Sequence, residues 1–263
     1  MPSRTATPSD FGTQLRHWRR ARGVSQLELA TRAGTTPRHV SFIETGRSRP
    51  GRDVILRIAE SLRLSVRECN DLLASAGLPR AYAERPLDDA SILPILDDLR
   101  TLVEGHAPYP AAVIEETGRV RLCNATYERL LPGALERTPE ELIDQFYGPP
   151  GRAAIENWEE IAWVNAERRR RGAERSGDPR LVELVDRAFA WLEDVPRPAF
   201  DPRDEAPLIM PRIRIGADVV STYSAALRFE TAREVTLSEL RVELIYPSDA
   251  EGARVFRRLA ATR

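Results

Sequence analysis

The sequence predicts two domains, an all-α domain of five helices followed by an α+β domain with a five-stranded antiparallel sheet. Its 263 residues exceed the size of one small domain. Helical periodicity fills the first part of the chain, and apolar runs typical of strands occur only in the second. We place the first domain at residues 8–77, a linker at 78–90 and the second domain at 91–263.

The two predicted domains differ in charge. Residues 1–80 carry 14 Arg and 7 Asp or Glu, a net charge of +7, whereas the rest of the chain has a net charge of −8. All 39 basic residues are Arg. A small basic domain joined to an acidic one is typical of a nucleic-acid-binding protein with a separate second module, because only the surface that contacts phosphates needs positive charge.

Three helices open the first domain. Residues 9–22 carry apolar side chains at helical spacing, and residues 25–28 (Ser-Gln-Leu-Glu) form a capping-box pattern that starts a second helix. Thr36 followed by Pro37 is typical of the start of a third helix. Two short helices joined by a tight turn, here with Gly34, form the helix-turn-helix pattern. The residues expected to face inward from the second helix are Leu27, Leu29 and Ala30.

Two more helices complete the first domain. Apolar residues recur at helical spacing over 54–62, and Ser65 and Glu68 form a second capping-box pattern. Pro79 and Pro86 then interrupt the periodicity, which indicates the linker.

Apolar and β-branched runs predict five strands in the second domain. Residues 110–116 and 119–123 are separated by Thr117 and Gly118, which is typical of a hairpin. The other three strands are predicted at Leu208–Ile215, Val219–Phe229 and Thr236–Tyr246. Helices are predicted at Ser91–Glu104, Asn124–Leu131, Ile155–Arg171, Pro179–Asp194 and Asp249–Ala260.

The composition excludes several classes of protein. No run of about 18 apolar residues could span a bilayer. The polar N-terminal residues lack the apolar stretch of a signal peptide, so we expect a cytoplasmic protein with no membrane partner. Cys69 and Cys123 are too few for a disulfide framework and form no C-x-x-C pair, so we expect no metal site. His106 is the only histidine outside the first domain that could ligate haem, and we expect no cofactor.

The first domain resembles the helix-turn-helix of the lambda and 434 repressor type, known as the XRE family. The resemblance covers residues 11–76 and rests on Ser-Gln-Leu-Glu-Leu-Ala at 25–30, Ala-Gly-Thr-Thr at 33–36 and Ile-Glu-Thr-Gly-Arg at 43–47. Residues 38–50 resemble in particular the MmyB-like regulators within this family. Segments of the second half that resemble the same group are Tyr109–Ala111, Leu122–Ala125, Asn157-Trp158, Gly177–Pro179 and Leu237–Arg241.

The resemblance implies a transcription regulator that binds an inverted-repeat operator in double-stranded DNA as a homodimer. It places Thr36, Arg38 and Phe42 where base edges are contacted, with Arg38 suited to guanine and Phe42 to a thymine methyl group. The family often has Gln at positions 37, 38 and 42, so the resemblance does not predict the operator sequence that this chain binds. The resemblance also implies an ion pair between Arg19 and Glu44 beneath the third helix. Phosphate contacts are implied for Gln26, His39, Arg47, Arg49 and Arg52.

The second domain resembles a PAS domain, a fold that holds small ligands between a curved sheet and its helices. The MmyB-like group implies an apolar ligand of fatty-acid type, similar to myristate. We expect the helix with Trp158 and Ile161 to close a cavity over one face of the last two strands, with the Arg run at 168–171 near the carboxylate. The predicted ligand-binding residues are Trp158, Ile161, Arg170, Tyr223, Ala225, Leu227, Val242, Leu244 and Tyr246. Its aromatic residues are also candidates for an ordinary core, and the Arg run for a solvated face.

Two alternatives stay open at the level of sequence. The chain could be a helix-turn-helix repressor or antitoxin whose second half serves only for oligomerisation, and a small molecule that co-purifies with the protein would separate the two interpretations. An enzyme within residues 90–263 is the other alternative. Those residues contain no G-x-S-x-G, H-E-x-x-H, Walker or dinucleotide-binding pattern, which argues against it.

Overall fold

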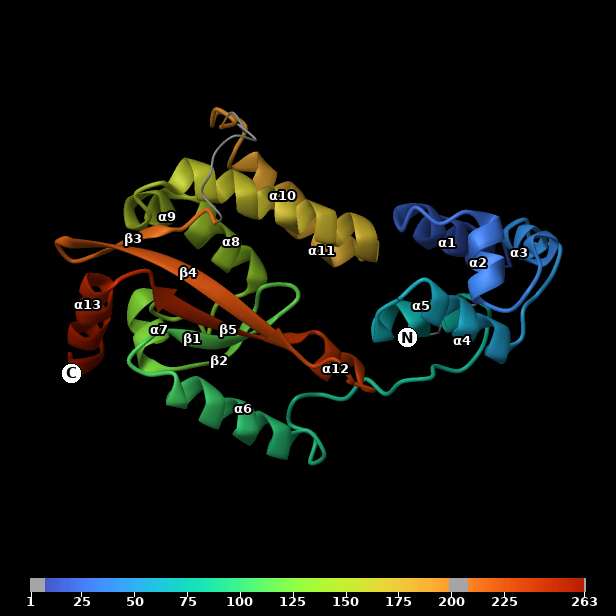
Figure 1. Cartoon of the computed structure of the whole chain (residues 1–263), viewed down its shortest axis with the longest axis horizontal. Helices are drawn as coiled ribbons and strands as arrows, with labels where there is room; N and C mark the ends of the chain where they lie inside the picture. The colour runs from blue at the N-terminus through green and yellow to red at the C-terminus, as the bar shows by residue number, and fades with distance from the viewer. Residues whose placement is uncertain (1–7, 199–207, 263) are drawn as a thin grey trace. The chain divides into compact units, whose positions relative to one another are not determined.

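The chain forms two compact units in a computed structural model that describes residues 8–198 and 208–262 (Figure 1). The first unit contains the described residues up to Pro86, together with Glu174–Ser176 and Glu230–Ser238. The second contains the other described residues. An all-α region followed by an α+β region with five antiparallel strands confirms the predicted fold class.

Five helices pack around one apolar core in the first unit. They are α1 (Pro8–Ala21), α2 (Gln26–Arg32), α3 (Pro37–Glu44), α4 (Arg52–Ser61) and α5 (Val66–Ser75). The largest fully buried side chains of this core are Leu15, Leu29, Ile43, Ile55, Ile58, Leu62, Leu72 and Leu73.

Local caps start three of these helices as predicted. The Thr36 hydroxyl accepts a hydrogen bond from the His39 backbone N–H at 3.1 Å, and Pro37 occupies the first turn of α3. Ser65 and Glu68 form the complete capping box of α5. At α2 only half of the predicted box forms, since the carboxylate of Glu28 binds Arg32.

The prediction that Leu27 faces inward is wrong. Leu27 is 65% exposed, whereas Leu29 and Ala30 are buried. Residues two positions apart lie on different sides of a helix, so Leu27 and Leu29 cannot both enter the core from α2.

A buried ion pair joins α1 to the end of α3, as the resemblance implied. The Arg19 guanidinium donates to both carboxylate oxygens of Glu44, at 2.5 and 3.0 Å, and to the Val24 carbonyl at 2.8 Å. Gln26 donates to the same carboxylate at 2.9 Å. Burial acts to raise the pKa of Glu44, but these hydrogen bonds and the charges of Arg19 and Arg16 outweigh it, so the pKa lies below its ordinary value of 4.5.

A close approach of α1 and α3 accompanies this pair. A Cβ atom at Gly12 of α1 would lie 2.7 Å from the carbonyl oxygen of Glu44 and 2.9 Å from that of Ile43. Only glycine leaves room for the two backbones at this position, because neither carbonyl can rotate away as a side chain could.

Two further segments belong to the first unit. Asn70 of α5 is buried, and its side chain binds the backbone of Ala81 and Tyr82 at 2.8 to 3.0 Å. The next residues form a parallel bridge between Ala83 and Glu234, with a 2.9 Å hydrogen bond from the Val235 N–H to the Ala83 carbonyl. We call residues Leu78–Pro86 the strap. The bridge therefore holds Glu234 and Val235, which lie about 150 residues further along the chain, against the strap.

The sheet of the second unit has the strand order β2-β1-β5-β4-β3, and all neighbours are antiparallel. Its strands are β1 (Ala111–Glu115), β2 (Val120–Cys123), β3 (Arg212–Ile215), β4 (Asp218–Arg228) and β5 (Leu240–Pro247). β3 starts later than predicted, directly after Pro211, which has no N–H for a ladder. Residues 235–238 form the short helix α12 (Val235–Ser238) rather than the start of β5, because the Glu234 carboxylate caps its Leu237 N–H at 2.8 Å.

Helices lie on both sides of this sheet, with α6 on one side and α8, α10 and α11 on the other (Figure 1). The structure contains α8 and α9, which were not predicted. The helices that include residues of the second unit are α6 (Leu93–Gly105), α7 (Ala125–Leu130), α8 (Pro139–Tyr147), α9 (Pro149–Ala154), α10 (Trp158–Ser176), α11 (Pro179–Ala190) and α13 (Ala250–Ala261). Within residues 8–198 and 208–262, none of the helices is long and apolar enough to cross a membrane.

We predict that Glu44→Ala destabilises the first unit by about 3 to 5 kcal/mol, because it leaves a buried guanidinium without its carboxylate. The measurement is hydrogen exchange of residues 8–77 in the full chain at pH 7. Glu28→Ala is the control, since its exposed pair with Arg32 contributes at most about 1 kcal/mol. The pKa of Glu44 is lowered by folding, so the difference from the parent should shrink as the pH falls below 4.5. Equal exchange in parent and Glu44→Ala would contradict the role of the pair.

We also predict that Gly12→Ala destabilises the first unit by about 1 to 3 kcal/mol, because α1 must move away from the α3 carbonyls. The matched control is Gly172→Ala in α10, where a Cβ has open space and should be neutral or stabilising by about 0.5 to 1 kcal/mol. Hydrogen exchange recorded for each unit along a denaturant titration measures the change in unfolding free energy for both variants. A stabilised Gly12→Ala protein would show that the two helices separate freely.

Candidate nucleic-acid interface and ligand site

Two arginines lie close to one aromatic ring of the third helix. The guanidinium carbon of Arg38 lies 5.1 Å from the centroid of the Phe42 ring, and that of Arg47 lies 5.9 Å from it. Arg38 is in the first turn of α3, and Arg47 follows its end, where Gly46 adopts a φ of +72°. Such cation–π contacts stabilise by about 0.5 to 1 kcal/mol at exposed sites. They therefore restrain two exposed cations on one surface.

The start of α3 is held by hydroxyl groups. Besides the Thr36 cap, the Thr35 hydroxyl lies 2.8 Å from Nδ1 of His39. His39 and Thr36 thus occupy fixed positions at the helix N-terminus, whose free N–H groups attract anions. The structure brings Thr36, Arg38, His39, Phe42 and Arg47 together on this helix and the turn that follows it.

The other predicted phosphate-binding residues differ in their surroundings. Arg49 is exposed in the turn before α4. Arg52 donates to the Pro79 carbonyl at 2.6 Å, and Gln26 donates to Glu44. Within the described residues, ion pairs involve none of Arg38, Arg47 and Arg49. These three cations are thus available for an external anion, whereas Gln26 and Arg52 already bind groups of the first unit.

Sequence reasoning missed Arg16. Its guanidinium donates to the Glu44 carbonyl at 2.8 Å and also lies 3.5 Å from the carboxylate. It precedes Arg19 by three residues on α1, which places both on one side of the helix. That spacing could have indicated that both arginines approach the end of α3.

The predicted residues of β4 and β5 lie on one face of the sheet. Leu227 pairs with Val242, Ala225 with Leu244 and Tyr223 with Tyr246 across the two strands. The last two rings stack, with centroids 5.4 Å apart. These strands supply one side of a candidate ligand site.

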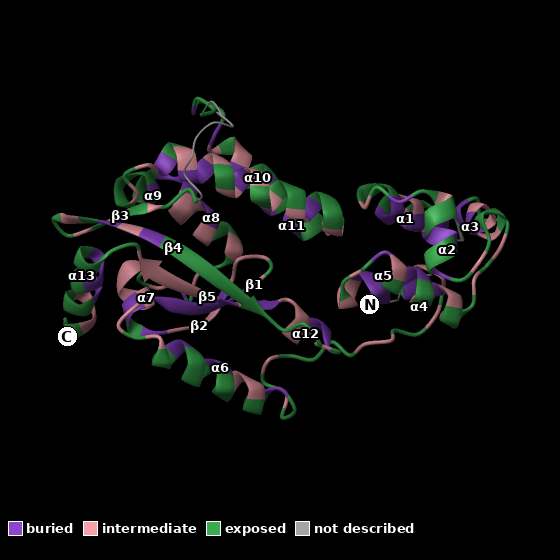
Figure 2. Cartoon of the chain, in the orientation of Figure 1, coloured by how far each residue is buried: buried purple, intermediate pink, exposed green. Residues whose placement is uncertain are grey.

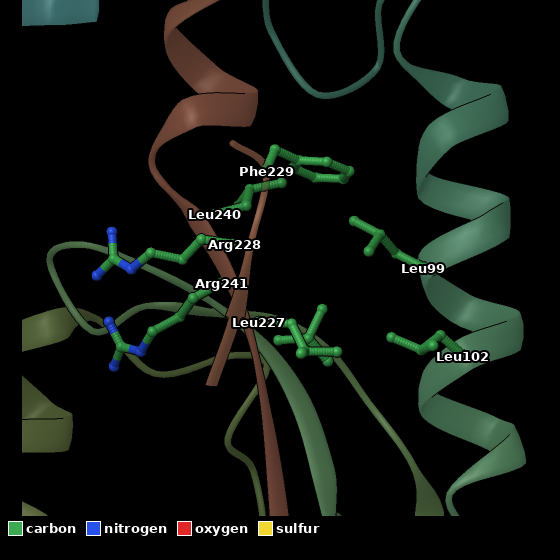
Figure 3. A pocket seen from close by; sticks show the side chains of 8 residues that line it. Leu99, Leu102, Leu227, Arg228, Phe229, Leu240 and Arg241 are labelled. Carbon is green, nitrogen blue, oxygen red and sulfur yellow. The ribbon is translucent and has the colours of Figure 1, made fainter. Parts of the chain in front are cut away.

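A small apolar pocket lies between this face and α6. Figure 3 shows Leu227, Leu240 and Phe229 facing Leu99 and Leu102 of α6. The pocket has a volume of about 150 Å³. Sequence reasoning missed Leu99, Leu102 and Phe229 as lining residues, although Leu99 and Leu102 follow the helical spacing of three.

The prediction that α10 closes this face is wrong, because α6 covers it. Trp158 instead packs among helices with Ile143 and Leu184, and its indole N–H donates to the Phe146 carbonyl at 2.9 Å. Ile161 is buried on the same helix. Arg170 is exposed and pairs with Glu167 at 2.6 Å. The nine predicted ligand-binding residues therefore do not line one cavity.

In the part of the chain that the structure describes, His, Cys, Asp and Glu side chains form no group of three that could hold a metal ion. A 150 Å³ pocket with mostly apolar walls suits the tip of an apolar molecule, since an enclosed apolar cavity of that volume holds benzene.

Comparison with known families agrees with both parts of the chain. Residues 10–72 match the family described as helix-turn-helix domain. Residues 95–259, more than half of the chain, match the family described as MmyB-like transcription regulator ligand binding domain. No curated protein matches the chain. The chain therefore belongs to the MmyB-like family, as a ligand-responsive transcription regulator with a helix-turn-helix DNA-binding domain.

Proposed function

We propose that the chain binds an inverted-repeat operator as a homodimer, with α3 in the major groove. One helix-turn-helix domain covers about half of such a site, and half-sites typically lie about one helical turn apart. The observation that carries this proposal is the pair of exposed cations held at the Phe42 ring. Because these two arginine side chains are already restrained, they lose less conformational entropy when they bind DNA.

Base contacts are assigned to Thr36, Arg38 and Phe42. An arginine in the first turn of the helix can reach guanine O6 and N7 with two parallel hydrogen bonds. Phosphate contacts are assigned to His39, Arg47 and Arg49, which surround the same helix. Gln26 and Arg52 would join them through donors that their present partners leave unused, since each carries more than one N–H.

We further propose that the second domain binds a long-chain fatty acid whose apolar end enters the pocket beneath α6. Leu102, Leu227 and Phe229 at its rim are each at least 40% exposed, so apolar surface continues beyond the pocket. Figure 2 shows this end of β4 as exposed. A longer chain would cover that surface, and each buried methylene contributes about 0.8 kcal/mol.

Ligand response then requires that the fatty acid bind one arrangement of the dimer better than another. The pocket lies where β4 ends and β5 begins, and the connection between these strands, Glu230–Ser238, belongs to the first unit. Chain continuity therefore links the ligand site to the DNA-binding unit.

We predict that Arg38→Ala weakens binding to the specific operator by about 1 to 3 kcal/mol and blurs its sequence preference, because a base contact is lost. Arg47→Ala should weaken specific and random DNA alike. Titrations of the full chain at several salt concentrations measure both, with the exposed Arg20→Ala of α1 as control. Equal losses on the two DNAs for Arg38→Ala would remove it from base contact.

For the ligand, we predict that the delipidated full chain binds fatty acids saturably and more tightly with increasing chain length, by up to about fourfold per methylene. Leu227→Gln should weaken this binding, whereas Leu135→Gln, an exposed leucine outside the pocket, should not. Calorimetry gives the affinities, and operator titrations with and without ligand give the response. Absence of saturable binding at every length would favour a domain that serves only for oligomerisation.

A further inference from the structure

The face of the sheet opposite α6 carries arginines on neighbouring strands. Arg228 of β4 and Arg241 of β5 are direct partners in the ladder. Figure 3 shows both guanidiniums on the side away from Leu99 and Leu102. Like charges directly opposite each other destabilise an antiparallel pair. The placement therefore needs a compensating interaction.

Helix α10 adds further positive charge to this face. The guanidinium of Arg169 packs on the turn between β1 and β2, where a Cβ at Gly118 would lie 3.3 Å from its Nη2. Arg241 interacts electrostatically with Arg168, Arg169 and Arg228. Arg169 thus lies against the turn that starts at Glu115, whose carbonyl accepts hydrogen bonds from the Gly118 N–H and from Arg241.

Negative charge on this face is scarce. Glu243 is the acidic residue that interacts with both Arg169 and Arg241. Within residues 8–198 and 208–262, ion pairs hold neither Arg169 nor Arg228 nor Arg241, and the Nη1 of Arg241 donates to the Glu115 carbonyl at 3.3 Å. Arg169 and Arg241 therefore share one carboxylate.

Burial makes this arrangement unfavourable without an anion. Burial lowers the pKa of Arg169, and the charge of Arg168 lowers it further. The pKa of Arg241 is lowered mainly by burial as well, against the opposing effect of Glu243. An arginine side chain does not lose its proton in proteins, so deprotonation cannot relieve the repulsion.

A buried hydroxyl lies beside this group. Tyr147 of α8 is fully buried, and its hydroxyl lies against the Arg169 guanidinium without a well-aligned hydrogen bond. Burial raises the pKa of Tyr147 to about 12, so the hydroxyl keeps its proton and can donate it. It interacts electrostatically with Arg168 and Arg169. A buried hydroxyl without a well-aligned partner needs an explanation, and a bound water or ion is one such explanation.

We propose that Arg169, Arg228, Arg241 and the Tyr147 hydroxyl form an anion-binding site for a carboxylate or phosphate group on this face of the sheet. The site deepens the proposed ligand-binding function and rests on it. Guanidinium forks bind both groups through paired, charge-assisted hydrogen bonds. Exposed Arg228 lies where the anion can enter from solvent. The anion is either a free phosphate or the head group of a fatty acid whose chain reaches the pocket around the edge of β4, which pairs with β3 only as far as Ser221.

Calorimetric titration of the delipidated full chain tests the site with three probes: sodium myristate, uncharged tetradecanol and inorganic phosphate. The variants are Arg169→Gln and Arg241→Gln, and the control is Arg171→Gln, an exposed arginine of the same helix. We expect the parent and the control to bind myristate or phosphate saturably. The two variants should bind it about tenfold to a hundredfold more weakly. Their melting temperatures without ligand should not fall, because each variant removes a crowded cation.

The outcomes separate this site from the apolar pocket. Phosphate binding that depends on Arg169, without any fatty-acid binding, would support the anion site and overturn the fatty-acid proposal. Myristate binding that Leu227→Gln weakens and Arg169→Gln leaves unchanged would overturn the anion site alone, as would equal affinity for myristate and tetradecanol. If neither anion binds the parent, the anion site is overturned. Should Arg169→Gln fail to fold, Arg228→Gln on the exposed end of β4 provides the same comparison.

Discussion

The buried contact between Arg19 and Glu44 fixes the helix that carries the candidate DNA-contacting residues. Glu44 ends α3, and its carboxylate receives hydrogen bonds from α1 and from Gln26 at the start of α2. Buried ion pairs add little net stability, because desolvation offsets their attraction, but an unpaired charge is costly. The pair therefore acts chiefly by excluding other orientations of α3. The glycine contact at position 12 has the same effect, since it brings the two backbones together at one place.

Much of the first unit could be predicted from the sequence, because its determinants are local. The caps at Thr36 and Ser65 lie within three residues of the groups they bind. The second unit was predictable only in part. Strand alternation correctly divides β5 into two sets of side chains, yet it does not say which helix covers each set. That choice depends on contacts distant in sequence, and α6 lies where α10 was expected.

The same limit applies to the candidate sites. The resemblance selected Arg38, Phe42 and Arg47, but their stacking depends on the turn at Gly46. In the run of four arginines, Arg170 is exposed and paired with Glu167, whereas Arg169 packs on the turn at Gly118. Neighbouring residues of a helix point about 100° apart, so composition alone could not separate these two.

The bridge between Ala83 and Glu234 has a consequence for synthesis on the ribosome. The five N-terminal helices bury an apolar core whose residues have all been translated once Tyr82 has been added. The strap acquires its partner only when residues 234–235 have been translated, after most of the second unit. The first unit therefore cannot be completed before β4 has been synthesised. A nascent chain released earlier would contain the five helices but lack the residues that pair with the strap.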